Sequence, residues 1–223
     1  MAPIDFHWLE EAGLAEDPCK IRCPQCFQKL DLSLFPPFTR TSCPSCGNEV
    51  IVPVVFAGFE LYELLHESSR SRIYRARDGI LQRDVALKIS KAPEWNEYYR
   101  ESFALLASQE HPGILWIYTA GDCGDFTYGA LQLMEQGSLG RNPKLRDAQG
   151  VGKLLGHSVP LWEALRMLRE RDVVHGDICP ENLLCNQRGA FRLANFRPLG
   201  AEWPLPPDNW RYRSPEVLRE GIF

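Results

Sequence analysis

Alternating apolar and polar positions mark the middle of the N-terminal half of the chain. The segments FELYELL (59–65), SRIYRARD (71–78) and DVALKIS (84–90) each follow the two-residue period of a β-strand. Polar stretches at 66–71 and 78–84 separate these segments and contain the Gly, Ser and Asp residues that favour turns. The pattern therefore predicts three consecutive strands joined by turns.

A helical period replaces this alternation after the third strand. PEWNEYYRESFALLASQE (93–110) predicts a helix that begins at its proline and ends before the HPG sequence at 111–113. ILWIYTAG (114–121) and YGALQLME (128–135) predict two further strands, and LWEALRMLRERD (161–172) again has apolar residues at helical spacing. Strands with one helix among them, followed by helices, predict an α+β fold.

Two tight cysteine pairs precede this region. Cys23 and Cys26 form one C-x2-C pair, Cys43 and Cys46 form the other, and sixteen residues separate the pairs. Four thiolates satisfy the tetrahedral coordination of Zn²⁺, and the spacing resembles that of the zinc-ribbon family. Because the protein would supply all four ligands, we expect a structural zinc ion. The alternatives are reduced cysteines packed in a core and a redox-active pair.

The predicted ribbon covers residues 19–54. It is too short to fold by apolar burial alone, so metal binding would supply its folding free energy. Gly47 permits the positive φ that turns backbone N–H groups towards the sulfur atoms. The alternating runs KLDLSL (29–34) and EVIVPVV (49–55) predict its strands.

Composition narrows the choice of partners and location. The 223 residues have a formal net charge of -4, which argues against a general nucleic-acid binder. No stretch of about 18 apolar residues predicts a membrane span, and the first sixteen residues do not resemble a signal peptide. We therefore expect a cytoplasmic protein with a protein partner, and eight cysteines that do not pair as disulfides.

From about residue 58 onward, the order of motifs resembles the protein kinase family. Five segments carry the resemblance: DVALKI (84–89) for V-A-x-K, HPGIL (111–115) for H-P-N-I, HGDICPENLL (175–184) for H-R-D-L-K-P-E-N, NFR (195–197) for D-F-G, and RYRSPEVL (211–218) for Y-M-A-P-E. The P-E-N sequence favours the serine/threonine branch. The resemblance implies a bilobal domain behind the ribbon.

The domain organisation follows from these two resemblances. We predict an N-terminal extension (1–18), the zinc ribbon (19–54), a kinase-like N-lobe (58–137) and a partial C-lobe (138–223). Because the family has several more helices after the last motif, the C-lobe is expected to be incomplete. Either the chain is part of a longer one, or a companion protein covers that surface.

The resemblance also assigns roles to individual residues. Asp177 takes the position of the catalytic base and Asn182 that of a magnesium ligand. The positions that contact ATP in the family are held here by Lys88, Ile73, Ala86, Leu184 and Asn195. The hydrophobic stack that joins the lobes corresponds to Leu106, His175 and Phe196.

Several charged or flexible groups of the family are replaced. The three loop glycines that approach phosphate become His66, Ser68 and Ser71, and a polar hairpin turn is the favoured interpretation. Asn195 replaces the D-F-G aspartate, and a neutral amide is a poor ligand for magnesium. Ser102 stands where the helix glutamate that pairs with Lys88 is expected, with Glu101 one residue away.

The catalytic loop and the activation region are altered as well. Gly176 and Cys179 replace an arginine and a lysine, and Arg197 replaces the D-F-G glycine. No Ser, Thr or Tyr precedes Tyr212 in the activation region, where Asn209 replaces the usual threonine. The resemblance thus implies a pseudokinase that acts in interaction or regulation, with ATP and Mg²⁺ binding in doubt. The alternatives are an active, divergent serine/threonine kinase, and a ribbon interaction module beside a decayed kinase region.

Overall fold

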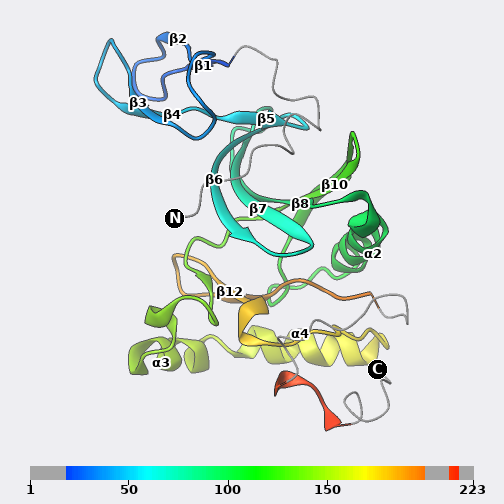
Figure 1. The fold of residues 1–223 in the computed structure, drawn as a ribbon. Coiled ribbons are helices and arrows are strands. Elements are labelled where there is room, and N and C mark those ends of the chain that lie inside the picture. The colour runs from blue at the N-terminus through cyan, green and yellow to red at the C-terminus, as the bar shows by residue number, and fades with distance from the viewer. Residues whose placement is uncertain (1–18, 199–210, 216–223) are drawn as a thin grey trace. The chain divides into compact units, whose positions relative to one another are not determined.

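The chain folds into two units, which are described separately. The structure is a computed structural model that describes residues 19–198 and 211–215 (Figure 1). One unit comprises Met1–Trp95 and Gly121–Tyr128, and the other comprises Asn96–Ala120 and Gly129–Phe223. The strands β9 (Ile117–Cys123) and β10 (Phe126–Gln132) run from one unit into the other. The predicted four-part domain division remains a prediction.

The first unit begins with two small antiparallel hairpins. β1 (Lys20–Arg22) pairs with β2 (Lys29–Asp31), and β3 (Arg40–Ser42) pairs with β4 (Glu49–Ile51). Each hairpin carries one cysteine pair in its turn. Their shared core consists of Cys23, Leu30, Leu32, Cys43, Val50 and Val52. The two cysteine-bearing turns therefore share one apolar core.

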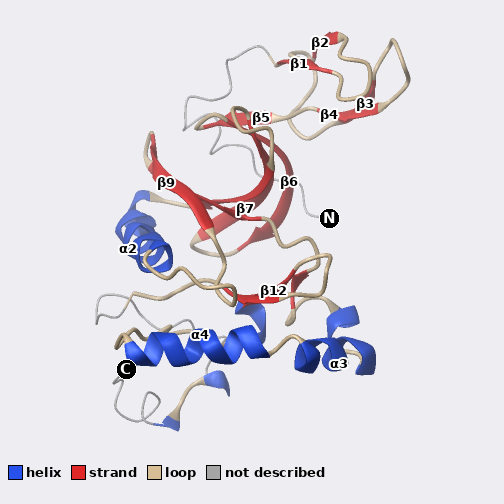
Figure 2. Ribbon diagram, turned by 180° about the vertical axis from the view of Figure 1, so that it is seen from behind, coloured by secondary structure: helices blue, strands red, loops and turns tan. Residues whose placement is uncertain are grey.

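An antiparallel sheet follows in the same unit. Four of the six strands of this sheet lie wholly in the unit: β5 (Val54–Phe56), β6 (Phe59–Glu67), β7 (Ser71–Asp78) and β8 (Asp84–Ser90), hydrogen-bonded in that order. The strands curve strongly, as Figure 2 shows, and two register shifts interrupt the β6–β7 pairing. A short 3-10 helix (Pro93–Trp95) follows β8.

The second unit contains the helices and a small sheet. Its helices are α2 (Asn96–Ala107), α3 (Ala148–Gly156) and α4 (Val159–Glu170), with 3-10 turns at Pro143–Leu145 and Pro180–Asn182. β11 (Gly137–Ser138), β12 (Leu183–Cys185) and β13 (Phe191–Leu193) form a three-stranded sheet in that order. In the part of the chain that the structure describes, no helix combines the length and apolar character that crossing a bilayer requires.

The predicted α+β fold is confirmed. The strands at 71–78 and 84–90 have the predicted bounds, and the helix predicted over 93–110 is the short 3-10 turn followed by α2. The run EVIVPVV is not one strand, because Pro53 cannot donate a ladder hydrogen bond and the run divides into β4 and β5. The strand predicted over 114–121 starts only at Ile117.

Gly113 marks a close approach of two segments in the second unit. A Cβ added at this glycine would lie 2.6 Å from the Pro160 carbonyl carbon and 3.1 Å from the Ala164 Cβ, both in α4. We expect Gly113→Ala to lower the free energy of unfolding by about 1–3 kcal/mol, through overpacking. Urea denaturation measures the change. Gly152→Ala in α3, where nothing lies within 4 Å, is the matched control; an equal loss in both variants would contradict the explanation.

Candidate functional site

The four cysteines of the two C-x2-C turns, called knuckles below, converge on one point of the first unit. The sulfur atoms of Cys23, Cys26, Cys43 and Cys46 all lie within 4.8 Å of one another, and the pairs Cys23–Cys46 and Cys26–Cys43 are 3.6 Å apart. A tetrahedral zinc site with bonds of about 2.3 Å has sulfur–sulfur edges of about 3.8 Å. The predicted ligand set therefore has the geometry of a site that could hold a metal ion.

The two knuckles repeat the same backbone geometry. The amide of Cys23 donates to Gln28 and the amide of Phe27 donates back to Cys23, and the second knuckle has equivalent bonds. The predicted positive φ of Gly47 is confirmed at 72°, and Phe27 has the equivalent φ of 60°. The bulky Phe27 gave no sequence signal for this conformation, because positive φ favours glycine. Hydrogen bonds from the backbone of Cys26 and then Gln25 lower the pKa of Cys23 to about 7, whereas hydrogen bonds with the neighbouring thiols raise the pKa of Cys46.

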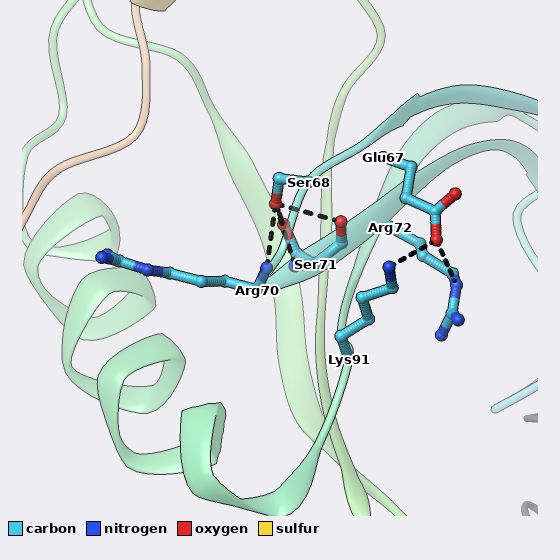
Figure 3. A network of polar contacts seen from close by, with 6 residues as sticks. All are labelled: Glu67, Ser68, Arg70, Ser71, Arg72 and Lys91. Atoms are coloured by element: carbon cyan, nitrogen blue, oxygen red, sulfur yellow. Dashed lines mark hydrogen bonds and ion pairs between the residues drawn. The ribbon is translucent and has the colours of Figure 1, made fainter. Parts of the chain in front are cut away.

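The turn at the glycine-loop position is a closed polar hairpin. The Ser68 hydroxyl oxygen accepts hydrogen bonds from the amides of Arg70 (3.2 Å) and Ser71 (3.0 Å), and the Ser68 amide donates to the Ser71 carbonyl (2.9 Å). Figure 3 shows the contacts of the Ser68 hydroxyl with Arg70 and Ser71. Backbone donors that could meet a phosphate are thus already bonded to a side chain of the turn itself.

An ion-paired cluster lies beside this turn. The Glu67 carboxylate is 3.1 Å from Arg72 Nε and 2.8 Å from Lys91 Nζ (Figure 3). The hydrogen bond from Lys91 holds the pKa of Glu67 below its ordinary value. The Arg70 guanidinium lies over the Trp95 ring, 4.6 Å from its centroid. The cationic side chains near the turn therefore all have partners within the protein: Arg72 and Lys91 contact Glu67, and Arg70 contacts Trp95.

Three predicted ATP-contacting residues share one face of the sheet. Ile73 on β7 lies directly opposite Lys88 on β8, and Ala86 is two residues before Lys88 on the same strand. Lys88 is buried, with 7% of its surface exposed. These residues belong to the first unit.

The other predicted site residues belong to the second unit. The Asn182 side-chain amide donates to both the carbonyl and the carboxylate of Asp177, each at 2.8 Å. The Asn195 amide donates to the Asn182 side-chain oxygen at 3.3 Å. Asn195 has φ 68°, a left-handed conformation that asparagine tolerates better than most residues. The structure thus joins Asp177, Asn182 and Asn195 in one hydrogen-bonded chain. Leu184 lies on β12 opposite Ser138 and Arg192.

Ser102 has a partner that the sequence did not predict. Its hydroxyl donates to the carbonyl of Phe196 at 2.6 Å, and the serine is buried in α2. The Phe196 ring is fully buried and lies 4.4 Å from the His175 ring, between centroids. A neutral hydrogen bond therefore ties α2 to the NFR turn at the position where the resemblance implied an ionic glutamate.

Cys179 and Arg197 are both buried. Burial, followed by the charge of Asp177, raises the pKa of Cys179 to about 12, so its thiol is neutral and cannot replace a lysine. The backbone amide of Arg197 donates to the His175 carbonyl at 3.0 Å. Asn209 lies outside the described residues.

His175 predicts a pH-dependent stability. Burial lowers the pKa of this histidine from 6.5 to about 4. Between these values the unfolded chain binds more protons than the folded chain, so stability falls as the pH decreases from about 6.5 towards 4. We expect a loss on the order of 3 kcal/mol at pH 4, measured by urea unfolding at several pH values. His175→Phe should reduce this slope, whereas the exposed His157→Gln should retain it; equal slopes in both variants would contradict the assignment.

Comparisons with known proteins agree with the motif order. No protein-family model matches the chain. It is 31% identical over 145 residues to the DNA damage-responsive serine/threonine-protein kinase RqkA of Deinococcus radiodurans, covering 62% of this chain and 22% of that protein. It is 24% identical over 143 residues to the serine/threonine-protein kinase PrkC of Bacillus subtilis, with the same two coverages. The solved apo form of PpkA-294 aligns with a TM-score of 0.56 at 20% identity, covering 65% of this chain and 60% of that one.

The chain is protein-kinase-like. The relatives are serine/threonine kinases, which agrees with the branch that the P-E-N sequence favoured. This kinase-like chain spans about a fifth of the length of the two curated relatives, so the activity, substrates and partners of those whole proteins do not transfer to it directly. The resemblance seen in the motifs and the kinase-like fold are confirmed.

Proposed function

We propose that this protein-kinase-like chain is a catalytically impaired pseudokinase that acts through protein interaction in signalling regulation. The observation that carries the proposal is the hydrogen-bonded chain of Asn195, Asn182 and Asp177. Asn195 donates an N–H where the family has an aspartate, and Asp177 is the one carboxylate of these three side chains. Because Mg²⁺ favours anionic oxygen ligands, this set is poorly suited to hold the metal for phosphoryl transfer.

The closed hairpin supports the same function. Phosphoryl transfer requires backbone amides that approach the phosphates, and the amides of Arg70 and Ser71 are bonded to the Ser68 hydroxyl instead. Losing one electrostatic contributor typically slows turnover by about 100-fold or more. ATP and Mg²⁺ are therefore not proposed as working cofactors.

We propose Zn²⁺ as the structural metal of the ribbon, held by the four cysteines in a site with no place left for substrate. A protein partner is proposed for the domain, rather than nucleic acid or a membrane. In the second unit, Leu155, Val159 and Trp162 are largely exposed on α3 and α4, which supports a companion protein that covers these helices.

An active, divergent serine/threonine kinase is the second candidate. The buried Lys88 and the Asp177–Asn182 hydrogen bond favour it, because both residues correspond to the family's catalytic positions. A ribbon interaction module beside a decayed kinase region is the third. The third candidate would be favoured if variants in the kinase-like region still bound the partner while Cys23→Ser no longer bound it.

Nucleotide binding separates the first two candidates. We expect no thermal shift with 1 mM ATP and excess Mg²⁺, because both the phosphate donors and the metal ligand are altered. A dissociation constant of about 0.1 mM would instead stabilise the folded protein by about 1.4 kcal/mol and raise the melting temperature by several degrees. Phosphate transfer to a generic protein substrate that disappears in Asp177→Ala would establish the active kinase.

A further inference from the structure

One aromatic contact joins the ribbon to the sheet of the first unit. Phe38 lies in the ribbon loop between β2 and β3, and its ring stacks on Tyr74 of β7 with a centroid distance of 5.8 Å and an interplanar angle of 6°. Tyr74 is fully buried, between the sheet and this ring. A residue of the ribbon therefore forms part of the packing around a central strand of the kinase-like sheet.

The ribbon core fixes the backbone of Phe38. The Phe38 amide donates to the Val52 carbonyl at 2.8 Å, and the Val52 amide donates to Thr39 at 2.9 Å. Phe38 has φ 61°, an unfavourable conformation for a bulky residue, so the surrounding contacts must maintain it. Val52 packs in the same core as Cys23 and Cys43, which are two of the metal-site cysteines.

Chain continuity gives the ribbon a second connection to the sheet. β4 of the ribbon leads through Val52 and Pro53 directly into β5, which pairs with β6. The Cys19 thiol, in the ribbon, donates to the Pro53 carbonyl at 3.7 Å. Loss of order in the ribbon would therefore disturb both the first strand of the sheet and the cover of Tyr74.

We propose that the ribbon is a metal-dependent brace of the kinase-like sheet: metal binding to the four cysteines orders the loop that presses Phe38 onto Tyr74, and so stabilises β5 to β8. The inference rests on the proposed zinc site. A peripheral module joined by a linker would leave the stability of the sheet unchanged when its metal is removed. A brace has the opposite consequence: removal of the metal lowers the stability of strands that contain no metal ligand.

Hydrogen–deuterium exchange with mass spectrometry tests the brace on the full chain. Metal removal with a zinc chelator should speed exchange of the β7 and β8 amides by about tenfold or more, alongside exchange in residues 19–52. Phe38→Ala should speed exchange of the β7 and β8 amides, while the variant binds as much zinc as the original protein. Phe38→Tyr, which keeps an aromatic ring at this position, should retain the original protection. Leu34→Ala, 97% exposed in the same loop, is the matched control and should change neither quantity.

Three results would overturn the brace. Chelation could speed exchange in residues 19–52 and leave β7 and β8 unchanged, or Phe38→Ala could leave their protection intact. Either result refutes the brace while the zinc site stands. Absence of bound zinc in the purified protein, measured by elemental analysis, refutes the zinc site itself and with it the metal dependence of the brace.

Discussion

Replacing Cys43 with serine should abolish stoichiometric zinc binding and unfold the ribbon. Cys43 is buried in the ribbon core, and its sulfur lies 3.6 Å from that of Cys26. Structural zinc in comparable small domains contributes an apparent binding free energy on the order of 10 kcal/mol, most of which is folding free energy. A serine hydroxyl is a poor replacement for a thiolate at neutral pH, so most of this contribution should be lost. Elemental analysis measures the metal, and limited proteolysis of residues 19–52 measures the order of the ribbon.

Cys19→Ser is the matched control for this variant. Cys19 lies four residues before Cys23, and it donates to the Pro53 carbonyl, outside the four-sulfur cluster. The same atom replacement at this position should leave the zinc content at one ion per chain. If Cys43→Ser retained full zinc and the original protease resistance, the four-cysteine site would be refuted.

Phe196→Ala should cost about 3–5 kcal/mol of unfolding free energy, the usual range for removing a buried aromatic ring. The ring is completely buried in the second unit and lies against His175. Truncation leaves a cavity at the NFR turn, where the backbone carbonyl also anchors Ser102 of α2. Urea denaturation followed by tryptophan fluorescence measures the loss.

The exposed Phe27 provides the comparison for Phe196. It is 68% exposed in the first knuckle, so Phe27→Ala removes the same number of atoms without leaving a cavity in a core. We expect less than about 1 kcal/mol from this change. A similar cost for the two variants would show that Phe196 does not organise the packing around the turn.

The elements predicted best from sequence are those with a clear local period. The bounds of β7 and β8 followed from their β-like patterns and the polar turns that flank them, and α2 followed from helical spacing. β1 and β3 were missed because KIR contains a single apolar residue and RTS contains none, so neither segment shows an alternating pattern. α3 was missed because its three glycines, at 150, 152 and 156, weaken the helical signal.

The four cysteines of the ribbon's candidate metal site could be identified from sequence, whereas the polar contacts of the kinase-like site could not. Cysteine spacing identifies four candidate ligands with few alternatives, and the structure brings their sulfur atoms together. In contrast, the hydrogen bond from Ser102 to Phe196 joins residues 94 positions apart. Motif comparison identified Ser102 as a departure but carried no information about its new partner. A substitution of this kind can be seen in the sequence, whereas the new hydrogen bond that replaces the lost ion pair can be seen only in the structure.

The self-bonded turn around Ser68 also has a consequence for recognition. A glycine-rich loop samples many conformations and loses that freedom when it closes on a ligand, whereas this turn has lost most of it before any encounter. The tip of the turn, which includes the exposed Ser69, therefore presents the same conformation to every protein that it meets. Such preorganisation suits a surface that binds another macromolecule more than it suits a loop that must close over a small molecule.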